Sequence, residues 1–393
     1  MDKKVIYLAL VLFTITFSLR ASNNMLMTTV PLVARYDFHF SSAVVGVVAS
    51  VSSVFAFLGS IINSRLRGES RRKTFVYASL AYAVLFPLFY LSNSVTVWLL
   101  SAAIGLAMGL VTPNLINVAG SYEDRKVRER MLSFYTVILS LSLIVGPSIE
   151  SVVLIRFSLL QAFLFFSVFA ATVAGTSFTV KFKPYGGRVT TNREVWKSSG
   201  FRAAVFNNLM YSLPFGMLTT FGGIYAVEQF HQSYAVATLL FTAFFGTSLL
   251  SRFAFTVRPP KNLWAMIGLS SVLTAGGLLA VAFSPNVTAY AMALLALGVP
   301  HGLTFPTSLV LLSRAFPSEE ERNVANSFYS ALMSGVGSFI PIVLGGIVEL
   351  AGLRFAFALL VPVSVAFSIL LVREYLSQPR EERPQPLAAG QRR

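Results

Sequence analysis

The 393-residue sequence contains no cysteine and few charged residues. The absence of cysteine excludes disulfide bonds, thiol catalysis and cysteine-ligated metal sites. Charged residues make up 12% of the chain, about half of the share expected in a soluble domain. Because 55% of the residues are hydrophobic, the composition indicates a chain that lies largely within a membrane.

The sequence also lacks the motifs of several classes of enzyme. It has no Gly-x-x-x-x-Gly-Lys-Ser/Thr nucleotide-binding motif, no cluster of metal ligands and no pairing of a nucleophile with a base. We therefore expect no enzymatic activity, no cofactor and no bound metal.

Apolar segments of roughly twenty residues follow one another along the chain, separated by short polar breaks. A helix of about this length crosses the hydrocarbon core of a bilayer while satisfying its own backbone hydrogen bonds. The pattern predicts an all-α integral membrane protein with twelve transmembrane helices, at residues 5–34, 41–63, 74–92, 96–119, 131–153, 158–180, 203–227, 233–256, 263–284, 287–313, 324–350 and 353–373.

These spans place the positive charge on one side of the membrane. The formal net charge is +15, and every Lys and Arg except Arg20, Arg35, Arg156 and Arg354 falls on one side. By the positive-inside rule that side is cytoplasmic. We therefore expect both termini in the cytoplasm and the protein in the cell (cytoplasmic) membrane. Since topology explains the basic charge, we expect no nucleic acid as a partner.

The chain repeats part of itself after about half of its length. Ser133-Phe134-Tyr135 recurs as Ser327-Phe328-Tyr329, and Pro147 recurs as Pro341, each pair 194 residues apart. A single repeat within a membrane-spanning pattern is typical of two-lobed transporters. Further matches occur in the same order: Thr28-Thr29 with Thr219-Thr220, Ser64-Arg65 with Ser251-Arg252, and Arg128 with Arg322.

The repeat and the longest internal polar break suggest four regions. We expect a six-helix bundle at residues 1–180, a basic cytoplasmic linker at 181–202, and a second six-helix bundle at 203–376. The tail at 377–393 is rich in Pro, Arg, Glu and Gln, and this composition predicts disorder.

The segment that leads into the span at 324–350 contains Pro317, Arg322 and Ala325. It resembles the Pro-x-x-x-x-Arg-x-x-Ala signature of the major facilitator superfamily, and the wider resemblance covers about residues 5–373. It implies two pseudo-symmetric bundles that alternate access to a central site. The basic loop residues expected to act in gating are Arg65, Arg128, Arg252 and Arg322.

Two signatures of that family are incomplete in this chain. Between the second and third spans Gly59 is kept, whereas Asn63 stands where the family has an acid. In the fifth span Gly146-Pro147 is similar to a motif of family antiporters, but Glu150 replaces its following glycine. The resemblance therefore supports the fold more strongly than any subfamily.

Arg20 is the main candidate for binding a substrate. It lies about fifteen residues into the first span, near the middle of the membrane. An arginine there costs about 2.5–3.5 kcal/mol on insertion scales, so it should face a watery cavity or a partner. Asn23 and Asn24 lie on the same helical face. One interpretation is an anionic substrate group on Arg20, and the other is structural bonding to a neighbouring helix.

Two further residues are candidates for carrying a coupling proton. His301 lies mid-span beside Pro300 and titrates near physiological pH, so it could relay a proton or contact the substrate. Its alternative role is that of a buried neutral side chain. Glu150 lies towards the outer end of the fifth span, where it would carry a proton if buried or simply lie among the lipid headgroups.

Uncharged polar residues complete the predicted substrate site. In the family, the first, fourth, seventh and tenth spans line the pathway. Each of these residues has interhelical hydrogen bonding as its alternative role. They are Asn114, Asn117, Asn207, Asn208, Tyr211 and, in the eleventh span, Tyr329.

We expect a secondary transporter of a small solute, with an organic anion favoured. The alternatives are efflux of drug-like or amphipathic compounds, and a non-transporting sensor or lipid-moving protein on the same fold. The expected partners are a small-molecule substrate and the lipid bilayer, and the expected oligomeric state is a monomer. Coupling to a proton or another ion, by symport or antiport, stays open at this point.

Overall fold

The computed structural model describes residues 3–66, 68–119, 125–180, 195–257, 262–316 and 319–377. Over these residues the regular structure is entirely helical, which confirms the predicted all-α class. The predicted linker and tail lie largely outside them. The helices are α1 (Lys3–Tyr36), α2 (Ser42–Arg65), α3 (Gly68–Leu88), α4 (Thr96–Ala119), α5 (Arg125–Leu154), α6 (Leu159–Ser177), α7 (Ser199–Met217), α8 (Gly223–Phe230), α9 (Tyr234–Val257), α10 (Leu263–Ala282), α11 (Val287–Ala315) and α12 (Glu319–Ser377).

Within the described residues, ten helical segments are long and apolar enough to cross a membrane. The last of them, Phe328–Ser377, is 50 residues long, more than a bilayer requires. It is broken at Gly352, whose backbone is non-helical with φ 80° and ψ 164°. The spans predicted at 324–350 and 353–373 therefore meet at a glycine kink. The chain is a multi-pass membrane protein, and the count of twelve spans stays a prediction.

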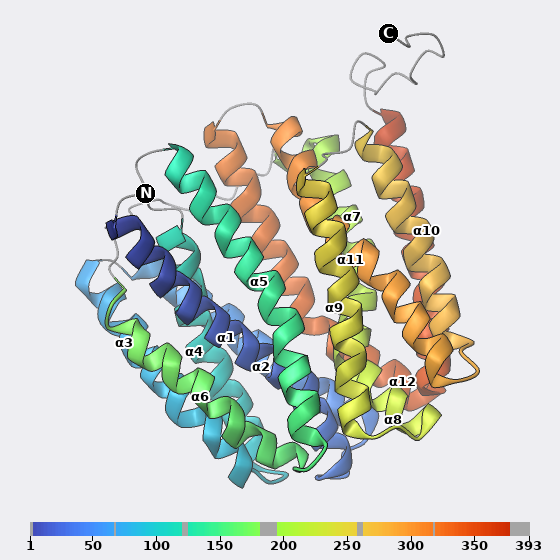
Figure 1. Cartoon of the computed structure of the whole chain (residues 1–393). Helices are drawn as coiled ribbons and strands as arrows, with labels where there is room; N and C mark the ends of the chain where they lie inside the picture. Colours follow the sequence, from blue (N-terminus) through green and yellow to red (C-terminus); the bar gives the residue numbers. More distant parts are fainter. Residues whose placement is uncertain are drawn as a thin grey trace.

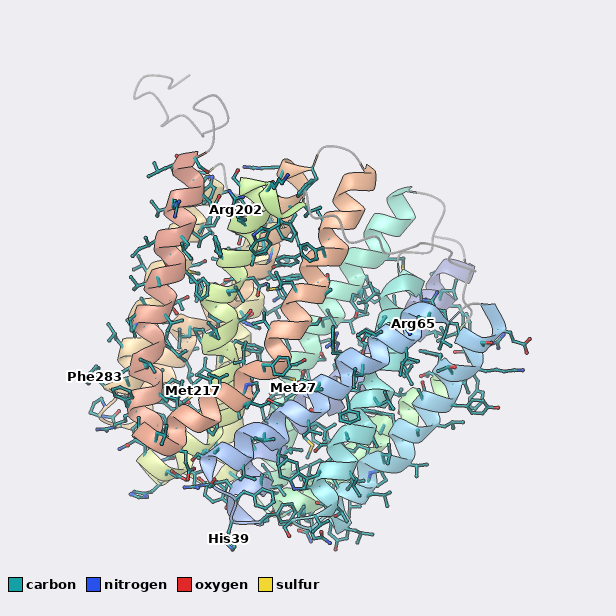
Figure 2. All side chains as sticks on the ribbon, turned by 180° about the vertical axis from the view of Figure 1, so that it is seen from behind. Met27, His39, Arg65, Arg202, Met217 and Phe283 are labelled. Atoms are coloured by element: carbon teal, nitrogen blue, oxygen red, sulfur yellow. The ribbon has the colours of Figure 1, made fainter. Side chains whose placement is uncertain are left out.

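The helices form two groups that lie side by side (Figure 1). Helices α1–α6 pack mainly on one another, as do α7–α12, and the groups meet where α2 packs on α12 and α5 on α9. The start of α1 and the end of α12 lie at the same end of the molecule (Figure 1). We call this the terminus end and the other the opposite end. Arg65 and Arg202 lie towards the terminus end, and His39 at the opposite end (Figure 2).

Glycine pairs allow close helix packing at matching places in the two groups. A Cβ at Gly109 of α4 would collide with the Ala56 carbonyl oxygen of α2. A Cβ at Gly302 of α11 would collide with the Ser248 carbonyl oxygen of α9. Small residues one turn apart let membrane helices approach closely, and both glycines have a partner four residues earlier, at Gly105 and Gly298.

In two helices, the backbone carbonyl that a proline leaves unpaired accepts a hydrogen bond from a neighbouring helix. A proline cannot donate to the carbonyl four residues earlier. Pro214 of α7 thus frees Met210, whose carbonyl accepts a hydrogen bond from Ser364 Oγ of α12 at 3.1 Å. Pro113 of α4 likewise frees the Gly109 carbonyl, which accepts from Ser60 at 3.3 Å. Neighbouring helices therefore make these bends tolerable in a membrane.

Helix α7 continues into α8 through η3 (Leu218–Gly222), a π-helical turn. The other short elements are 3-10 turns, η1 (Phe89–Leu91) and η2 (Val195–Lys197). The π-turn begins four residues after Pro214. Such turns often occur where a helix is locally rearranged, and here Thr219 and Thr220 of the turn line the central cavity.

Charged contacts join the two groups at the opposite end. Arg35 Nε at the end of α1 lies 2.7 Å from Glu228 Oε1 of α8. The backbone N–H of Ala43, in the first turn of α2, donates to Glu349 Oε2 of α12 at 3.2 Å. A carboxylate at a helix N-terminus is stabilised by the unpaired N–H groups and the helix dipole. These contacts hold the two groups together on that side.

Candidate functional site

A cavity of about 420 Å³ lies between the two helix groups. This volume suits a small-molecule ligand. It is lined from both groups, by residues of α1, α2 and α4 on one side and of α7, η3 and α12 on the other. Its polar lining residues are Arg20, Asn23, Ser52, Ser53, Ser60, Ser101, Thr112, Ser212, Thr219, Thr220, Ser334 and Ser338.

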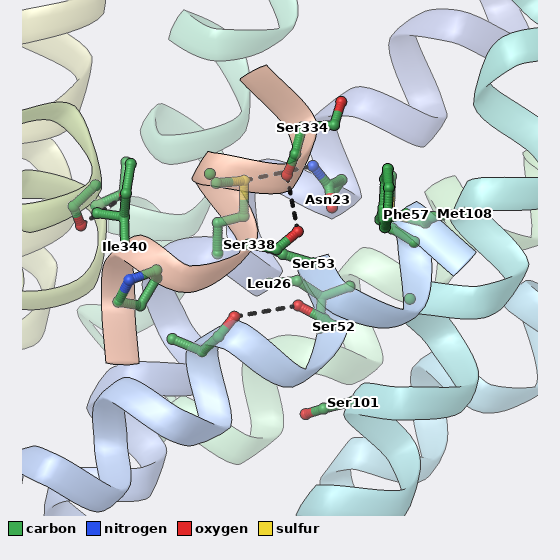
Figure 3. Close-up of a pocket in the computed structure, with 18 of the residues that line it drawn as sticks. Asn23, Leu26, Ser52, Ser53, Phe57, Ser101, Met108, Ser334, Ser338 and Ile340 are labelled. Carbon is green, nitrogen blue, oxygen red and sulfur yellow. Dashed lines mark hydrogen bonds between the residues drawn. The ribbon is translucent and has the colours of Figure 1, made fainter. Parts of the chain in front are cut away.

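Serine hydroxyls from the two groups face each other across this cavity. Ser52 and Ser53 of α2 lie opposite Ser334 and Ser338 of α12, with Asn23 of α1 beside them (Figure 3). These serines are not among the predicted site residues, because single serines occur throughout the apolar spans. Their spacing is the one signal in the sequence: Ser52 and Ser53 are adjacent, and Ser334 and Ser338 are four residues apart. The internal repeat does not pair the two spans that carry them.

The rest of the lining is apolar, with Leu26, Met27, Val30, Phe57, Met108, Phe215, Met333 and Ile340 among its residues. Arg20 is the one charged side chain among the described lining residues. The cavity can therefore accommodate an apolar body and a single anionic group. None of its described lining residues is an acid that could neutralise a cationic ligand.

The Arg20 side chain has an unpaired hydrogen-bond donor. Its Nε atom is buried and has no hydrogen-bond partner, and within the described residues the side chain makes no salt bridge. The predicted structural role, bonding to a neighbouring helix, is thus not seen in the described part of the chain. Because the residue lines the cavity, a ligand there would give the Arg20 guanidinium an acceptor.

Of the two predicted substrate contacts Asn23 and Asn208, the first lines the cavity and the second lies behind its wall. Asn23 lines it directly, and its one side-chain hydrogen bond within the described residues runs from Nδ2 to Met27 Sδ, at 3.6 Å. Asn208 Nδ2 donates to the Tyr329 hydroxyl at 2.5 Å, and Asn208 Oδ1 accepts from Ser212, which lines the cavity. Tyr329 is therefore two hydrogen bonds removed from the cavity wall.

Asn207 and Tyr211 lie on the other side of α7, against α11. Asn207 is fully buried, and its Nδ2 lies 2.8–3.0 Å from three acceptors, Thr304 O, Thr307 Oγ1 and Ser308 Oγ. The Tyr211 hydroxyl donates to the Leu297 carbonyl at 2.9 Å. Neither residue lines the cavity. Their observed contacts hold two helices together.

Asn114 belongs to a polar network near the terminus end. Its Nδ2 donates to Asn63 Oδ1 at 2.8 Å, and its Oδ1 accepts from Arg71 Nε at 2.6 Å. Asn63, which stands where the family has an acid, is therefore linked to Arg71 through the side-chain amide of Asn114. Asn114 does not line the cavity, and Arg71 was not anticipated as part of this network.

His301 lies behind the cavity wall, among aromatic rings. Its ring centroid is 4.4 Å from that of Phe215, which lines the cavity. Tyr211, Phe244 and Phe245 surround it at 5.5, 5.2 and 5.7 Å. His301 itself does not line the cavity. Any effect on a ligand would pass through the Phe215 ring.

Glu150 of α5 is fully buried, so the alternative location among the lipid headgroups is wrong. Its carboxyl oxygens contact the hydroxyls of Thr28, at 3.4 Å, and Thr29. Asn24 of α1 is also buried and away from the cavity, and its Nδ2 has no hydrogen-bond partner.

Of the residues predicted to act in gating, two have described side chains. Arg65 is exposed. Arg252 of α9 donates from Nη1 to Ser140 Oγ of α5 at 3.1 Å and so joins the two helix groups. The remaining site candidates, Asn117, Arg128 and Arg322, have side chains outside the described part of the structure.

The family described as Major Facilitator Superfamily matches residues 12–320 and 204–393 of this chain. The chain belongs to this superfamily. The resemblance seen in the loop before the eleventh predicted span is thereby confirmed. Membership makes the chain a transporter-family protein.

A curated relative is the "Uncharacterized MFS-type transporter EfpA" of Mycobacterium tuberculosis (strain CDC 1551 / Oshkosh). It is 32% identical over 126 residues, which cover 32% of this chain and 22% of the relative. The chain thus matches less than a quarter of that protein's length. The same protein of strain ATCC 25618 / H37Rv matches equally.

Solved transporters share the fold. A POT family transporter in complex with a thioalcohol conjugated peptide has a TM-score of 0.76 and 12% identity, covering 93% of this chain and 95% of its own. A mutant of the nucleoside transporter NupG has a TM-score of 0.73 and 14% identity, covering 93% of this chain and 99% of its own. At these identities the likeness shows the superfamily fold and leaves the substrate undetermined.

Proposed function

We propose that this superfamily member is a secondary active transporter that moves a small organic anion across the cytoplasmic membrane. One observation supports this most: Arg20 is the single charged side chain in the described lining of the central cavity, with no partner there. The proposal includes twelve transmembrane helices, both termini in the cytoplasm and a monomeric chain.

The chemistry of the cavity favours an anion with an apolar body. A guanidinium presents its donors in a planar fork that matches a carboxylate or phosphate in two-point contact. Asn23 and the facing serines offer further hydrogen bonds. The apolar wall with Phe57 and Met108 then accommodates the rest of the molecule. A carboxylate or phosphate on an apolar scaffold would therefore match the guanidinium, the hydrogen-bonding side chains and the apolar wall.

Alternating access is the mechanism that fits this arrangement. The two helix groups are joined at the opposite end by Arg35–Glu228 and by the Glu349 contact to α2. If the termini are cytoplasmic, the described state is closed to the outside. Rocking of one group against the other around the cavity would then expose Arg20 to each side in turn.

Efflux of amphipathic, drug-like compounds is a second candidate function. It is favoured by the aromatic and methionine side chains of the lining, which include Phe57, Phe215, Met27 and Met108. Methionine adapts its shape to varied ligands. This function differs from the first in that export should tolerate loss of the Arg20 charge.

The test begins with a thermal-shift screen of the purified protein against sugars, organic acids, phosphates and cationic dyes. Anions that stabilise the wild type are then assayed for uptake into proteoliposomes. We expect Arg20→Lys to weaken uptake and Arg20→Ala to abolish it, with folded protein retained. The matched control is Arg156→Ala, an exposed arginine away from the cavity, which should leave uptake unchanged. Full uptake of every stabilising anion by Arg20→Ala would refute the proposal.

A further inference from the structure

A buried carboxyl group joins α5 to α1 near the opposite end. The Glu150 side chain is 0% exposed. Its Oε1 contacts Thr29 Oγ1, and its Oε2 lies 3.4 Å from Thr28 Oγ1. These two hydroxyls are its hydrogen-bond partners within the described residues. It is not part of the cavity that holds Arg20.

The number of hydroxyl hydrogens around Glu150 is consistent with a protonated carboxyl group. A threonine hydroxyl has one hydrogen to donate. Thr28 Oγ1 lies 3.1 Å from the Asn24 carbonyl oxygen and 3.2 Å from that of Met25, both nearer than Glu150 Oε2. If Thr28 donates to one of these carbonyls, it can only accept from Glu150, which requires a proton on Oε2. Thr29 then donates to Oε1, and both carboxyl oxygens are satisfied.

No charge of opposite sign faces this carboxyl from the described helices that pack on α5. Helices α4 and α6 carry no charged residue. On α1, Arg20 lies two turns from Thr28, and Arg35 is paired with Glu228. On α9, Arg252 bonds to Ser140, more than two turns from Glu150. Burying an ionised carboxyl without a cation is strongly unfavourable.

The internal repeat shows that the fold does not require an acid at this place. Thr28-Thr29 corresponds to Thr219-Thr220, and Pro147 corresponds to Pro341. The residue that corresponds to Glu150 is Leu344, which is also buried. The second half therefore packs an apolar side chain where the first half has a carboxyl.

The same segment of α5 forms the contact between the two helix groups. Ser148 Oγ lies 3.2 Å from Thr242 Oγ1 of α9, and Ser151 Oγ donates to the Ala235 carbonyl at 2.8 Å. Glu150 lies between these two serines in the sequence. Opening of the opposite end would separate α5 from α9, and this would change the surroundings of Glu150.

We propose that Glu150 is a proton-binding site whose occupancy controls closure of the opposite end. With the proton on Oε2 the carboxyl is neutral and α5 rests on α9. When the O–H bond breaks, the proton passes to water on the opposite side, and the carboxylate requires hydration, which favours separation of the helices. The site would therefore couple transport to a proton. This inference is independent of the solute and of Arg20.

The test follows the opposite end of the full chain without any solute. Because the chain has no cysteine, Ser94→Cys and Phe283→Cys provide two unique spin-label sites, one exposed in each helix group. Phe283 follows α10 at the opposite end (Figure 2), and Ser94 lies in the turn that joins η1 to α4, at the other end of α3 from Arg65. Pulsed EPR distances are recorded across about pH 5 to pH 9. In the otherwise native chain, the ratio of open to closed forms should rise with pH, by up to about tenfold per pH unit while one proton titrates.

The decisive variant is Glu150→Gln, which keeps the shape and hydrogen bonding but cannot titrate. It should remain closed at every pH. Glu69→Gln is the control, since this carboxyl pairs with Lys73 within α3, away from the interface between the groups, and its replacement should keep the pH response. A pH response in Glu150→Gln equal to that of the native residue, its loss in Glu69→Gln, or its absence with Glu150 in place would each overturn the proposal.

A second measurement applies if Glu150→Gln does not fold. Infrared difference spectra of the wild type between low and high pH should contain the C=O band of a protonated, buried carboxyl. Thr29→Val removes the donor to Oε1 and should shift that band. If no such band appears, or if it is unaffected by Thr29→Val, the carboxyl does not hold the proton there. Since no solute is present, failure here leaves the anion proposal intact, and the reverse also holds.

Discussion

Asparagine side chains that look alike in the sequence occupy two different environments. Asn23 lines the cavity with a single weak contact, whereas Asn207 is fully buried among three acceptors of α11. Helical periodicity alone could place both on polar faces. It could not tell whether a polar face meets a cavity or another polar helix.

This difference predicts opposite effects of two alanine substitutions. Asn207→Ala should lower the free energy of unfolding by about 0.6–1.7 kcal/mol, which are the average and the largest values measured for interhelical hydrogen bonds in a membrane protein, and leave solute affinity unchanged. Asn23→Ala should weaken solute binding with little change in stability. Thermal unfolding and a binding titration of both variants, with a solute found in the screen, check the pair. A greater loss of affinity in Asn207→Ala would contradict the assignment.

At the scale of helices, close packing depends on glycines in α4 and α11. A methyl group at Gly109 or Gly302 would collide with a carbonyl oxygen of the facing helix. Overpacking of this kind costs about 1–3 kcal/mol. We therefore expect Gly109→Ala and Gly302→Ala each to lower the melting temperature in detergent.

Gly268 of α10 provides the matched control, because a Cβ there would meet nothing within 4 Å. Gly268→Ala should be neutral or slightly stabilising, since alanine is the better helix former. If all three substitutions had the same effect, the helix propensity of glycine rather than close packing would explain the result.

The bend in α7 leads to a further prediction at this scale. Ser364 donates to the Met210 carbonyl that Pro214 leaves unpaired. Ser364→Ala should therefore destabilise the protein by about 0.6–1.7 kcal/mol. In a Pro214→Ala background the helix can satisfy that carbonyl itself, so the same serine change should cost less. A double-mutant cycle measured by thermal unfolding checks this, and additive effects would contradict it.

At the scale of the whole molecule, an ion pair between the two helix groups helps to close the opposite end. The side chains of Arg35 and Glu228 are 31% and 34% exposed, so solvent screens much of their attraction. Glu228→Gln should raise the ratio of open to closed forms by up to about fivefold, equivalent to at most about 1 kcal/mol.

Spin-label distances between the two helix groups would measure this shift, which should shrink in high salt. Glu69→Gln is the control, because Glu69 pairs with Lys73 within α3, far from the interface between the groups. No change in Glu228→Gln, or an equal change in the control, would show that the ion pair does not hold this end closed.

The sequence by itself determined the fold class, the membrane-spanning character and the superfamily. These depend on local properties: the length and polarity of apolar segments, and a loop signature read residue by residue. It also identified Arg20 and Glu150 as unusual, because a charged side chain within an apolar span is costly wherever the helix packs.

Only the tertiary structure decided which of these polar residues meet. Asn114 contacts Asn63 instead of a solute, and Glu150 contacts Thr28 and Thr29 instead of the headgroups. Both outcomes depend on how helices distant in the sequence rotate and pack. Periodicity gives the face of a helix but not the neighbour of that face. The cavity serines of α2 and α12 gained their importance only when the two helix groups brought them together.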